Sequence, residues 1–213
     1  MVVLLTRTVS IITPCFNDGK YLPESIASAR SQTWKQKEII IIDDNSTDTQ
    51  TKRLLHDLAA QPDIRVLSVP EGRKGPSAAR NVGIAEAQGQ FILPLDADDK
   101  IDPTYMEKAV LRLEAQPSLA LCYCKARLFG LKNGLWHLPP YTWQTMICGN
   151  VIFPSALYRK ADWERVGGYD ESLIDGLEDY AFWLQILSPG RPVACLDEVL
   201  FHYRIKPYSR SAQ

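Results

Sequence analysis

The chain has 213 residues, 46% of them hydrophobic, and its 24 lysines and arginines balance 25 aspartates and glutamates. This length and composition predict one domain with a substantial core. The net charge of −1 excludes recruitment of nucleic acid or an anionic membrane by a global electrostatic field. The five cysteines show no C-x-x-C spacing, so a typical zinc or redox motif is excluded as well.

Short apolar runs alternate with helical patterns through the first half of the chain. We expect strands at 9–13, 38–43, 64–69 and 90–95. Apolar residues at helical spacing predict amphipathic helices around 22–29, 54–58 and 106–113. Strands and helices in succession imply right-handed crossovers, and near-continuously apolar strands are typical of burial on both faces. The sequence therefore predicts an α/β fold, a mostly parallel sheet with helices on both faces.

The pattern changes after about residue 117. A further strand is expected at 119–123, an irregular stretch at 130–140, a short helix at 160–166, a second helix beginning near Glu178 and a late strand at 193–196. No internal repeat and no long linker divides the chain, so residues 1–213 are predicted to form a single domain. Residues 1–5 are too short an apolar stretch for a signal peptide, which predicts a cytoplasmic protein.

Acidic side chains follow three of the predicted strands, within 13–18, 43–48 and 96–99. Because open α/β sheets bind ligands at the carboxyl ends of their strands, these side chains should converge on one edge. A divalent cation would relieve their mutual repulsion, and hard oxygen ligands favour Mg²⁺ or Mn²⁺. Such residues also form turns and cap helices, and for Asp48 a capping role is the favoured interpretation.

Five stretches in this order resemble glycosyltransferase family 2, namely SIITPCFN (10–17), IDDNSTD (42–48), GPSAARN (75–81), LDADD (95–99) and EDYAFW (178–183). The resemblance runs from about residue 9 to residue 204. It implies the GT-A fold, a Rossmann-like sheet with a nucleotide-binding half (8–117) and a smaller acceptor-binding half (118–205). It also implies an inverting transfer of a sugar from a nucleotide diphosphate, with Mn²⁺ or Mg²⁺ as cofactor.

The resemblance assigns a role to individual residues on the donor side. Asp44 is expected to read the base, with a lean towards uracil, and Asp96 to lie near the ribose. The metal would be bound by Asp98, Asp99 or both, a choice that the sequence leaves open. The full set of expected nucleotide-binding residues is Pro14, Phe16, Asn17, Asp44, Arg80 and Asp96. Arg80 could also form an ion pair with Asp96, a role that is compatible with nucleotide binding.

On the acceptor side, the resemblance implies that Asp179 is the general base, with Glu178 and Trp183 beside the acceptor. In the first turn of a helix the ionised form of Asp179 should be favoured, although an acidic pair there could merely complement the helix dipole. A histidine often found in the family near the end of the domain is replaced by Lys206. Lys206 or Arg204 could instead offer positive charge to the leaving group.

The expected partners are a nucleotide-sugar donor, with a UDP-sugar as the favoured one, and a saccharide or lipid-linked acceptor in polysaccharide or glycolipid synthesis. A lipid-linked acceptor would bring the protein to the inner face of the membrane as a peripheral protein. Two other functions stay open: a catalytically silent nucleotide-sugar-binding domain and a sugar nucleotidyltransferase. The second requires a glycine-rich basic loop after the first strand, which residues 14–17 do not provide. No dinucleotide-binding or P-loop motif is present.

Overall fold

The computed structural model describes residues 7–174, 176–187 and 189–207, so residues 1–5 lie outside it. The strands are β1 (Val9–Cys15), β2 (Lys37–Asp43), β3 (Ile64–Ser68), β4 (Phe91–Pro94), β5 (Lys100–Ile101), β6 (Leu121–Gly130), β7 (Gly134–Trp136), β8 (Leu157–Arg159) and β9 (Ala194–Ile205). The helices are α1 (Leu22–Arg30), α2 (Thr49–Ala59), α3 (Gly75–Glu86), α4 (Tyr105–Ala115), α5 (Trp143–Cys148), α6 (Lys160–Val166) and α7 (Glu178–Leu187).

The strands of the described residues form one mixed sheet in the order β3-β2-β1-β4-β8-β6-β9-β5, with β7 paired to β6. The pairs among β1 to β4 are parallel, β1 with β2 and β4, and β2 with β3, whereas β5 pairs antiparallel with β9. In the second half β8 runs antiparallel to β4 and β6, whereas β6 and β9 are parallel. The predicted α/β fold is confirmed, with the parallel part concentrated in the first half.

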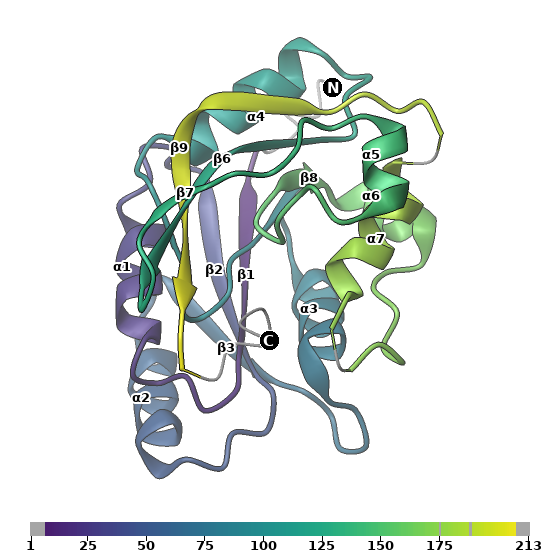
Figure 1. Cartoon of the computed structure of the whole chain (residues 1–213). Coiled ribbons are helices and arrows are strands. Elements are labelled where there is room, and N and C mark those ends of the chain that lie inside the picture. The colour runs from purple at the N-terminus through teal and green to yellow at the C-terminus, as the bar shows by residue number, and fades with distance from the viewer. Residues whose placement is uncertain (1–6, 175, 188, 208–213) are drawn as a thin grey trace, which may run out of the picture.

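Helices cover both faces of the parallel strands. Figure 1 shows α1 and α2 on one side of β1 and β2 and α3 on the other, while α5, α6 and α7 lie together beside the second half. The apolar run of β2 is fully buried, as expected for a strand covered on both faces. Helix α3 packs closely on the sheet at Gly83. A Cβ added to Gly83 would lie only 2.5 Å from Cδ1 of Ile42 on β2.

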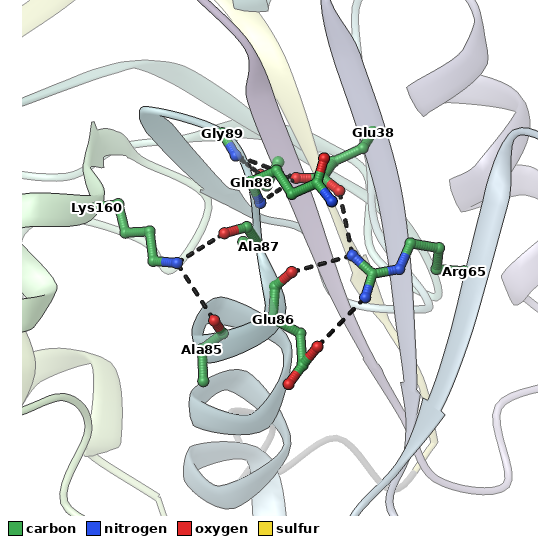
Figure 2. A network of polar contacts seen from close by, with 9 residues as sticks. Glu38, Arg65, Ala85, Glu86, Ala87, Gln88, Gly89 and Lys160 are labelled. Carbon is green, nitrogen blue, oxygen red and sulfur yellow. Dashed lines mark hydrogen bonds and ion pairs between the residues drawn. The ribbon is translucent and has the colours of Figure 1, made fainter. Parts of the chain in front are cut away.

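A polar network fixes the end of the sheet where the parallel strands begin (Figure 2). The Glu38 carboxylate on β2 accepts hydrogen bonds from Ser10 Oγ at 2.5 Å and from the Gln88 and Gly89 backbone N–H groups. Lys160 Nζ donates to the carbonyls of residues 85 and 87, and Arg65 donates to that of residue 86. These cations satisfy carbonyls at the end of α3, where the helix dipole favours positive charge.

Several elements were not predicted from the sequence. Helix α3 was recognised only as a motif, while β7, β8 and α5 are three to six residues long, too short for periodicity to identify. Strand β9 runs over twelve residues instead of the expected four. The predicted helix at 160–166 and the start of α7 at Glu178 are confirmed. No helix in the described part of the chain is long and apolar enough to cross a membrane.

Candidate active site

A cleft of about 740 Å³ opens at the carboxyl ends of β1, β2 and β4. Loops from the first half form one wall, and the segments leading into β8, into α7 and out of β9 form the other. The carboxylates predicted to converge do so, because Asp44, Asp96 and Asp98 all line this cleft. Glu178 and Asp179 line it from the start of α7. Two halves of the sequence therefore bring their acidic motifs to one cavity.

Asp44 lies at the end of the cleft formed by the loops after β1 and β2. Its Oδ2 accepts a hydrogen bond from the backbone N–H of Gly75 at 2.8 Å, and its own N–H donates to the carbonyl of Cys15. Pro14 and Phe16 line the same region, and Phe16 is 53% exposed. An exposed aromatic side chain beside a carboxylate provides an apolar face and an acceptor, which suits a planar base with an N–H group.

Asn17, predicted to contact the nucleotide, is not among the residues that line the cleft. Its backbone is left-handed, with φ of +56°, and its Oδ1 accepts hydrogen bonds from the N–H groups of Thr47 and Asp48, both at 2.8 Å. Asn tolerates this backbone conformation better than most residues. Asn17 thus joins the loops after β1 and β2. Asp48 caps α2 by accepting from Thr51 N–H at 2.7 Å, as predicted.

Arg80 on α3 lines the floor of the cleft and connects the two acidic motifs. It is 1% exposed and donates to Asp96 Oδ1 and to Glu178 Oε1, each at 2.8 Å. Burial alone would lower the pKa of Arg80, but the charges of Asp96 and Glu178 hold that pKa well above its ordinary value. The predicted ion pair with Asp96 is confirmed, and Glu178 is its second carboxylate. Arg80 therefore fixes Asp96 and Glu178 relative to each other.

Asp98 and Asp99 point in different directions. Asp98 lines the cleft, and its Oδ2 lies 2.8 Å from Lys206 Nζ. Asp99 is 1% exposed and is not a lining residue; its Oδ1 accepts from the Arg204 N–H at 2.8 Å. Burial raises the pKa of both carboxyls, and that of Asp99 furthest, with the neighbouring Asp98 charge as the next cause. Of the two candidate metal ligands, only Asp98 faces the cleft.

Asp98 and its surroundings fit a hard divalent cation. The carboxylate of Asp18 faces the same Lys206 ammonium at 2.9 Å, so two carboxylates from different loops surround one cationic position. Mg²⁺ and similar ions commonly use one or two protein carboxylates and take their other ligands from phosphates and water. Among the described residues no group of three or more histidine, cysteine or acidic side chains forms a complete metal cage. The two carboxylate ligands therefore suit an ion whose other ligands include phosphate oxygens.

Asp179 faces the cleft from the first turn of α7 and is half-buried. Its Oδ2 accepts from Asn150 Nδ2 at 2.9 Å and its Oδ1 from the Tyr180 N–H at 2.8 Å. Burial, followed by the nearby Glu178 charge, raises the pKa of Asp179 to about 6. Burial thus outweighs the stabilisation that the helix N-terminus gives to the ionised form. The carboxylate is still the major form at pH 7 and is basic enough to accept a proton.

The residue before α7 has an unusual backbone. Leu177 has a φ of +66°, a left-handed conformation that a branched apolar side chain rarely adopts, and its side chain is 68% exposed at the cleft. Its carbonyl accepts the Ala181 N–H at 2.9 Å, which begins the helix. Backbone strain of this kind is concentrated at functional sites. Here it sets the direction in which the Glu178 and Asp179 side chains leave the chain.

Trp183, expected beside the acceptor, lies in the core with no exposed surface. Its ring packs edge-on against Tyr158 with centroids 5.6 Å apart, and it is not a lining residue. A helix places residues four apart on neighbouring positions of one face, but sequence spacing does not say whether that face meets solvent or core. The expectation that Trp183 contacts an acceptor is therefore wrong for this structure.

Several lining residues and contacts were not predicted. Asp18 was expected among the converging carboxylates and Lys206 near the leaving group, but nothing in the sequence indicated that the two would form an ion pair. Asn150 lies in an irregular segment without a motif. Trp136, within the stretch that was expected to be irregular, both packs against Tyr203 with ring centroids 4.9 Å apart and lines the cleft. The aromatic and apolar part of the lining from the second half consists of Trp136, Leu138, Ile152, Phe153 and Tyr203.

A comparison with protein families decides what kind of domain carries this cleft. The sequence profile of glycosyl transferase family 2 matches residues 10–163, well over half of the chain. The chain belongs to glycosyl transferase family 2. The matched range contains the loops after β1, β2 and β4, with the carboxylates of the donor side, and it ends within α6.

Curated relatives of this family 2 chain include a chondroitin synthase of Escherichia coli, 27% identical over 186 residues, which are 85% of this chain and 27% of that protein. An uncharacterized glycosyltransferase of E. coli K12, YibD, is 31% identical over 162 residues, which are 76% of this chain and 44% of YibD. The chain thus spans between about a quarter and a half of the length of these relatives.

Solved structures share the fold of this family 2 chain. S. aureus TarS 1–349 in complex with UDP-GlcNAc superimposes with a TM-score of 0.78 at 21% identity, covering 97% of this chain and 61% of that TarS fragment. The mannosyltransferase PcManGT of Pyrobaculum calidifontis, in complex with GDP-Man and Mn²⁺, gives a TM-score of 0.69 at 18% identity and covers 97% of this chain and 59% of that chain. The GT-A fold expected from the sequence is confirmed.

Proposed function

We propose that this chain is an inverting glycosyltransferase that moves a sugar from a nucleotide diphosphate, most simply a UDP-sugar, to an acceptor hydroxyl. One observation carries the proposal: a single cleft is lined by Asp44, Asp96 and Asp98 from the strand ends and by the half-buried Asp179 from α7. The cleft therefore offers a donor site and a base within one cavity. Polysaccharide or glycolipid synthesis on the cytoplasmic side of a membrane is the process that we propose it serves.

The donor's nucleotide would occupy the end of the cleft between the loops after β1 and β2. Phe16 and Pro14 offer apolar surface to the base, and Asp44 offers an acceptor to a uracil N–H. Asp96, held by Arg80, would accept from a ribose hydroxyl. UDP and UDP-GlcNAc in complex with TarS support a uridine donor, as a property of a protein with the same fold.

Mn²⁺ or Mg²⁺ is the proposed cofactor, with Asp98 as its ligand from the chain and Asp18 as a neighbouring carboxylate. Bound with the diphosphate, such an ion neutralises charge that develops on the leaving group. Asp99 faces the core. We assign it a positioning role, because its carboxylate accepts a hydrogen bond from the Arg204 N–H and so holds that segment. The Mn²⁺ in the PcManGT complex supports this cofactor for the fold.

Asp179 is the proposed general base. It would take the proton of the acceptor hydroxyl while the acceptor oxygen bonds to the anomeric carbon and the bond from that carbon to the diphosphate breaks. Attack opposite the leaving group inverts the anomeric centre, so one carboxylate is sufficient, unlike in retaining hydrolysis. A pKa of about 6 leaves Asp179 ionised at neutral pH while keeping it a better base than an ordinary aspartate.

A thermal-shift panel tests the donor assignment. UDP, GDP, dTDP and CMP are added to the purified chain with and without Mn²⁺, because a ligand that binds only the native state raises its apparent stability. We expect UDP with Mn²⁺ to raise Tm most, and Asp44→Asn to reduce the preference for UDP over GDP. Stabilisation by none of the four nucleotides would refute the donor site and favour a different function.

A further inference from the structure

One lysine connects two acidic loops at the rim of the cleft. Lys206 Nζ lies 2.9 Å from Asp18 Oδ1 and 2.8 Å from Asp98 Oδ2. Asp18 follows β1, Asp98 follows β4 and Lys206 follows β9, so three distant segments meet at this ammonium group. All three side chains line the cleft and are between 17% and 26% exposed. The ion pairs are therefore partly shielded from water yet remain within reach of a ligand.

The other cations near this rim are committed elsewhere. Arg80 is held at the floor of the cleft by Asp96 and Glu178. Arg204 donates from Nε to the carbonyl of Asp98 at 2.8 Å, and its guanidinium lies 4.2 Å from the centre of the Phe129 ring, outside the lining. Among the described residues that line the cleft, Lys206 is thus the cation placed directly on the carboxylate proposed to bind metal.

An ammonium group and a divalent ion cannot both occupy this position. A metal ion of this class binds carboxylate oxygens at roughly 2.0–2.2 Å, well inside the present separation between Lys206 Nζ and Asp98 Oδ2. Both are positive, so their repulsion opposes joint occupancy in a partly buried site. A free metal ion would have to displace Lys206 from both carboxylates. A nucleotide diphosphate would change the balance, because it supplies oxygen ligands to the metal and a new anionic partner for the lysine.

We propose that Lys206 acts as a built-in counter-ion that occupies the metal position in the nucleotide-free protein and makes metal uptake depend on the nucleotide. This inference rests on the proposed donor site and adds an order to its assembly. Lys206 excludes the free ion, and metal and nucleotide diphosphate enter together. By linkage, the factor by which UDP increases the affinity for Mn²⁺ equals the factor by which Mn²⁺ increases the affinity for UDP.

The test is an Mn²⁺ titration of the full chain followed by electron paramagnetic resonance of the free ion, first without nucleotide and then with saturating UDP. Lys206→Met removes the charge and keeps most of the aliphatic length, and Lys206→Gln is a second variant should the first fail to fold. Lys108→Met is the matched control, since Lys108 pairs with Glu198 on the surface, away from the cleft. Circular dichroism establishes that each variant is folded.

Without nucleotide, we expect Lys206→Met to bind one Mn²⁺ about tenfold or more tightly than the wild type, because the competing positive charge is gone. Lys108→Met should match the wild type, and adding Asp98→Asn to Lys206→Met should abolish the gain. With UDP, the difference in Mn²⁺ affinity should shrink. Equal Mn²⁺ affinities of the wild type and both Lys206 variants without nucleotide would overturn the inference.

The two proposals fail in distinguishable ways. If UDP binds no variant, with or without Mn²⁺, the donor site is refuted, while the nucleotide-free titration still decides whether Lys206 excludes the ion. If UDP binds with Mn²⁺ but the Lys206 variants show no gain in nucleotide-free Mn²⁺ affinity, the donor site stands and the counter-ion role is refuted.

Discussion

Asp179 combines two properties that a general base needs at neutral pH. It faces the cleft, and burial together with Glu178 raises its pKa to about 6. Its two oxygens each accept one hydrogen bond, from Asn150 Nδ2 and from the Tyr180 N–H, which hold the carboxylate in one orientation. Among the residues that the structure describes, no cation forms an ion pair with Asp179, so its charge is available for proton transfer.

Asp179→Asn should separate chemistry from binding. The amide keeps the shape and an oxygen that accepts hydrogen bonds, but it cannot take the acceptor's proton. We expect turnover to fall by roughly 10²–10⁴-fold, measured as UDP release from a UDP-sugar, while the Kd for UDP stays unchanged. Asp170→Asn, at an exposed carboxylate outside the cleft lining, serves as control. Unchanged turnover in Asp179→Asn would remove Asp179 from the base role.

The raised pKa also predicts the acid limb of the pH profile. A base works only when deprotonated, and for a carboxyl with a pKa of about 6 the active form is lost as the pH falls through that value. The kcat/KM for the donor, which reports groups of the free protein, should therefore be half-maximal near pH 6. An acid limb centred near pH 4, the range of an ordinary aspartate, would show that burial does not tune this group.

At the scale of the elements, the turn after α6 holds the two halves of the site together. Gly167 and Gly168 both have positive φ, +82° and +88°. Asn81 on α3 accepts hydrogen bonds from the Tyr169 N–H at 2.9 Å and from Trp163 Nε1 at 3.0 Å. A Cβ on Gly168 would lie 2.7 Å from Asn81 Oδ1, whereas one on Gly167 would meet nothing within 4 Å. Only the second glycine is needed for close packing.

The adjacent glycines form a matched pair of mutations. Both Gly167→Ala and Gly168→Ala force an alanine into a left-handed backbone, but only the latter pushes a methyl group into the Asn81 contacts. Gly168→Ala should therefore reduce the free energy of unfolding by about 1–3 kcal/mol more than Gly167→Ala does, measured by urea denaturation. Equal losses in the two variants would mean that the turn tolerates the contact.

The convergence of the strand-end carboxylates could be predicted from the sequence pattern, whereas Arg80, Glu178 and Asp179 on helices were indicated only by the family resemblance. Asp44, Asp96 and Asp98 follow apolar strands that are parallel, so their convergence follows from topology alone. For Trp183 and Asp99 the motif indicates the segment but not which way the side chain points. Asn150 and Lys206 meet Asp179 and Asp98 through tertiary packing, for which local patterns carry no signal.

Across the whole molecule, the two ends of the parallel strands have different tasks. At the beginning of the strands, the network around Glu38 closes the end of α3 onto the sheet (Figure 2). At the other end, carboxylates from both halves face one cleft with Arg80 beneath them. Because Asp96 belongs to the first half and Glu178 to the second, the buried Arg80 joins the halves electrostatically.

Removing that cation should destabilise the whole domain. Arg80→Met leaves the Asp96 and Glu178 carboxylates without their shared partner in a site where Arg80 itself is 1% exposed. We expect a loss of about 3–5 kcal/mol in the free energy of unfolding, measured by urea denaturation. Arg30→Met, which breaks the exposed pair with Asp63, should cost at most about 1 kcal/mol. Similar losses in the two variants would contradict the proposed linking role.

The most direct test of the acidic rim as a donor site is a crystal structure of the chain with UDP and Mn²⁺. We predict the uracil beside Asp44, the ribose near Asp96 and the diphosphate on an Mn²⁺ ion bound to Asp98, with Lys206 moved off the Asp98 carboxylate. A nucleotide bound elsewhere on the molecule, or one in the cleft with its diphosphate turned away from Asp98, would contradict the account.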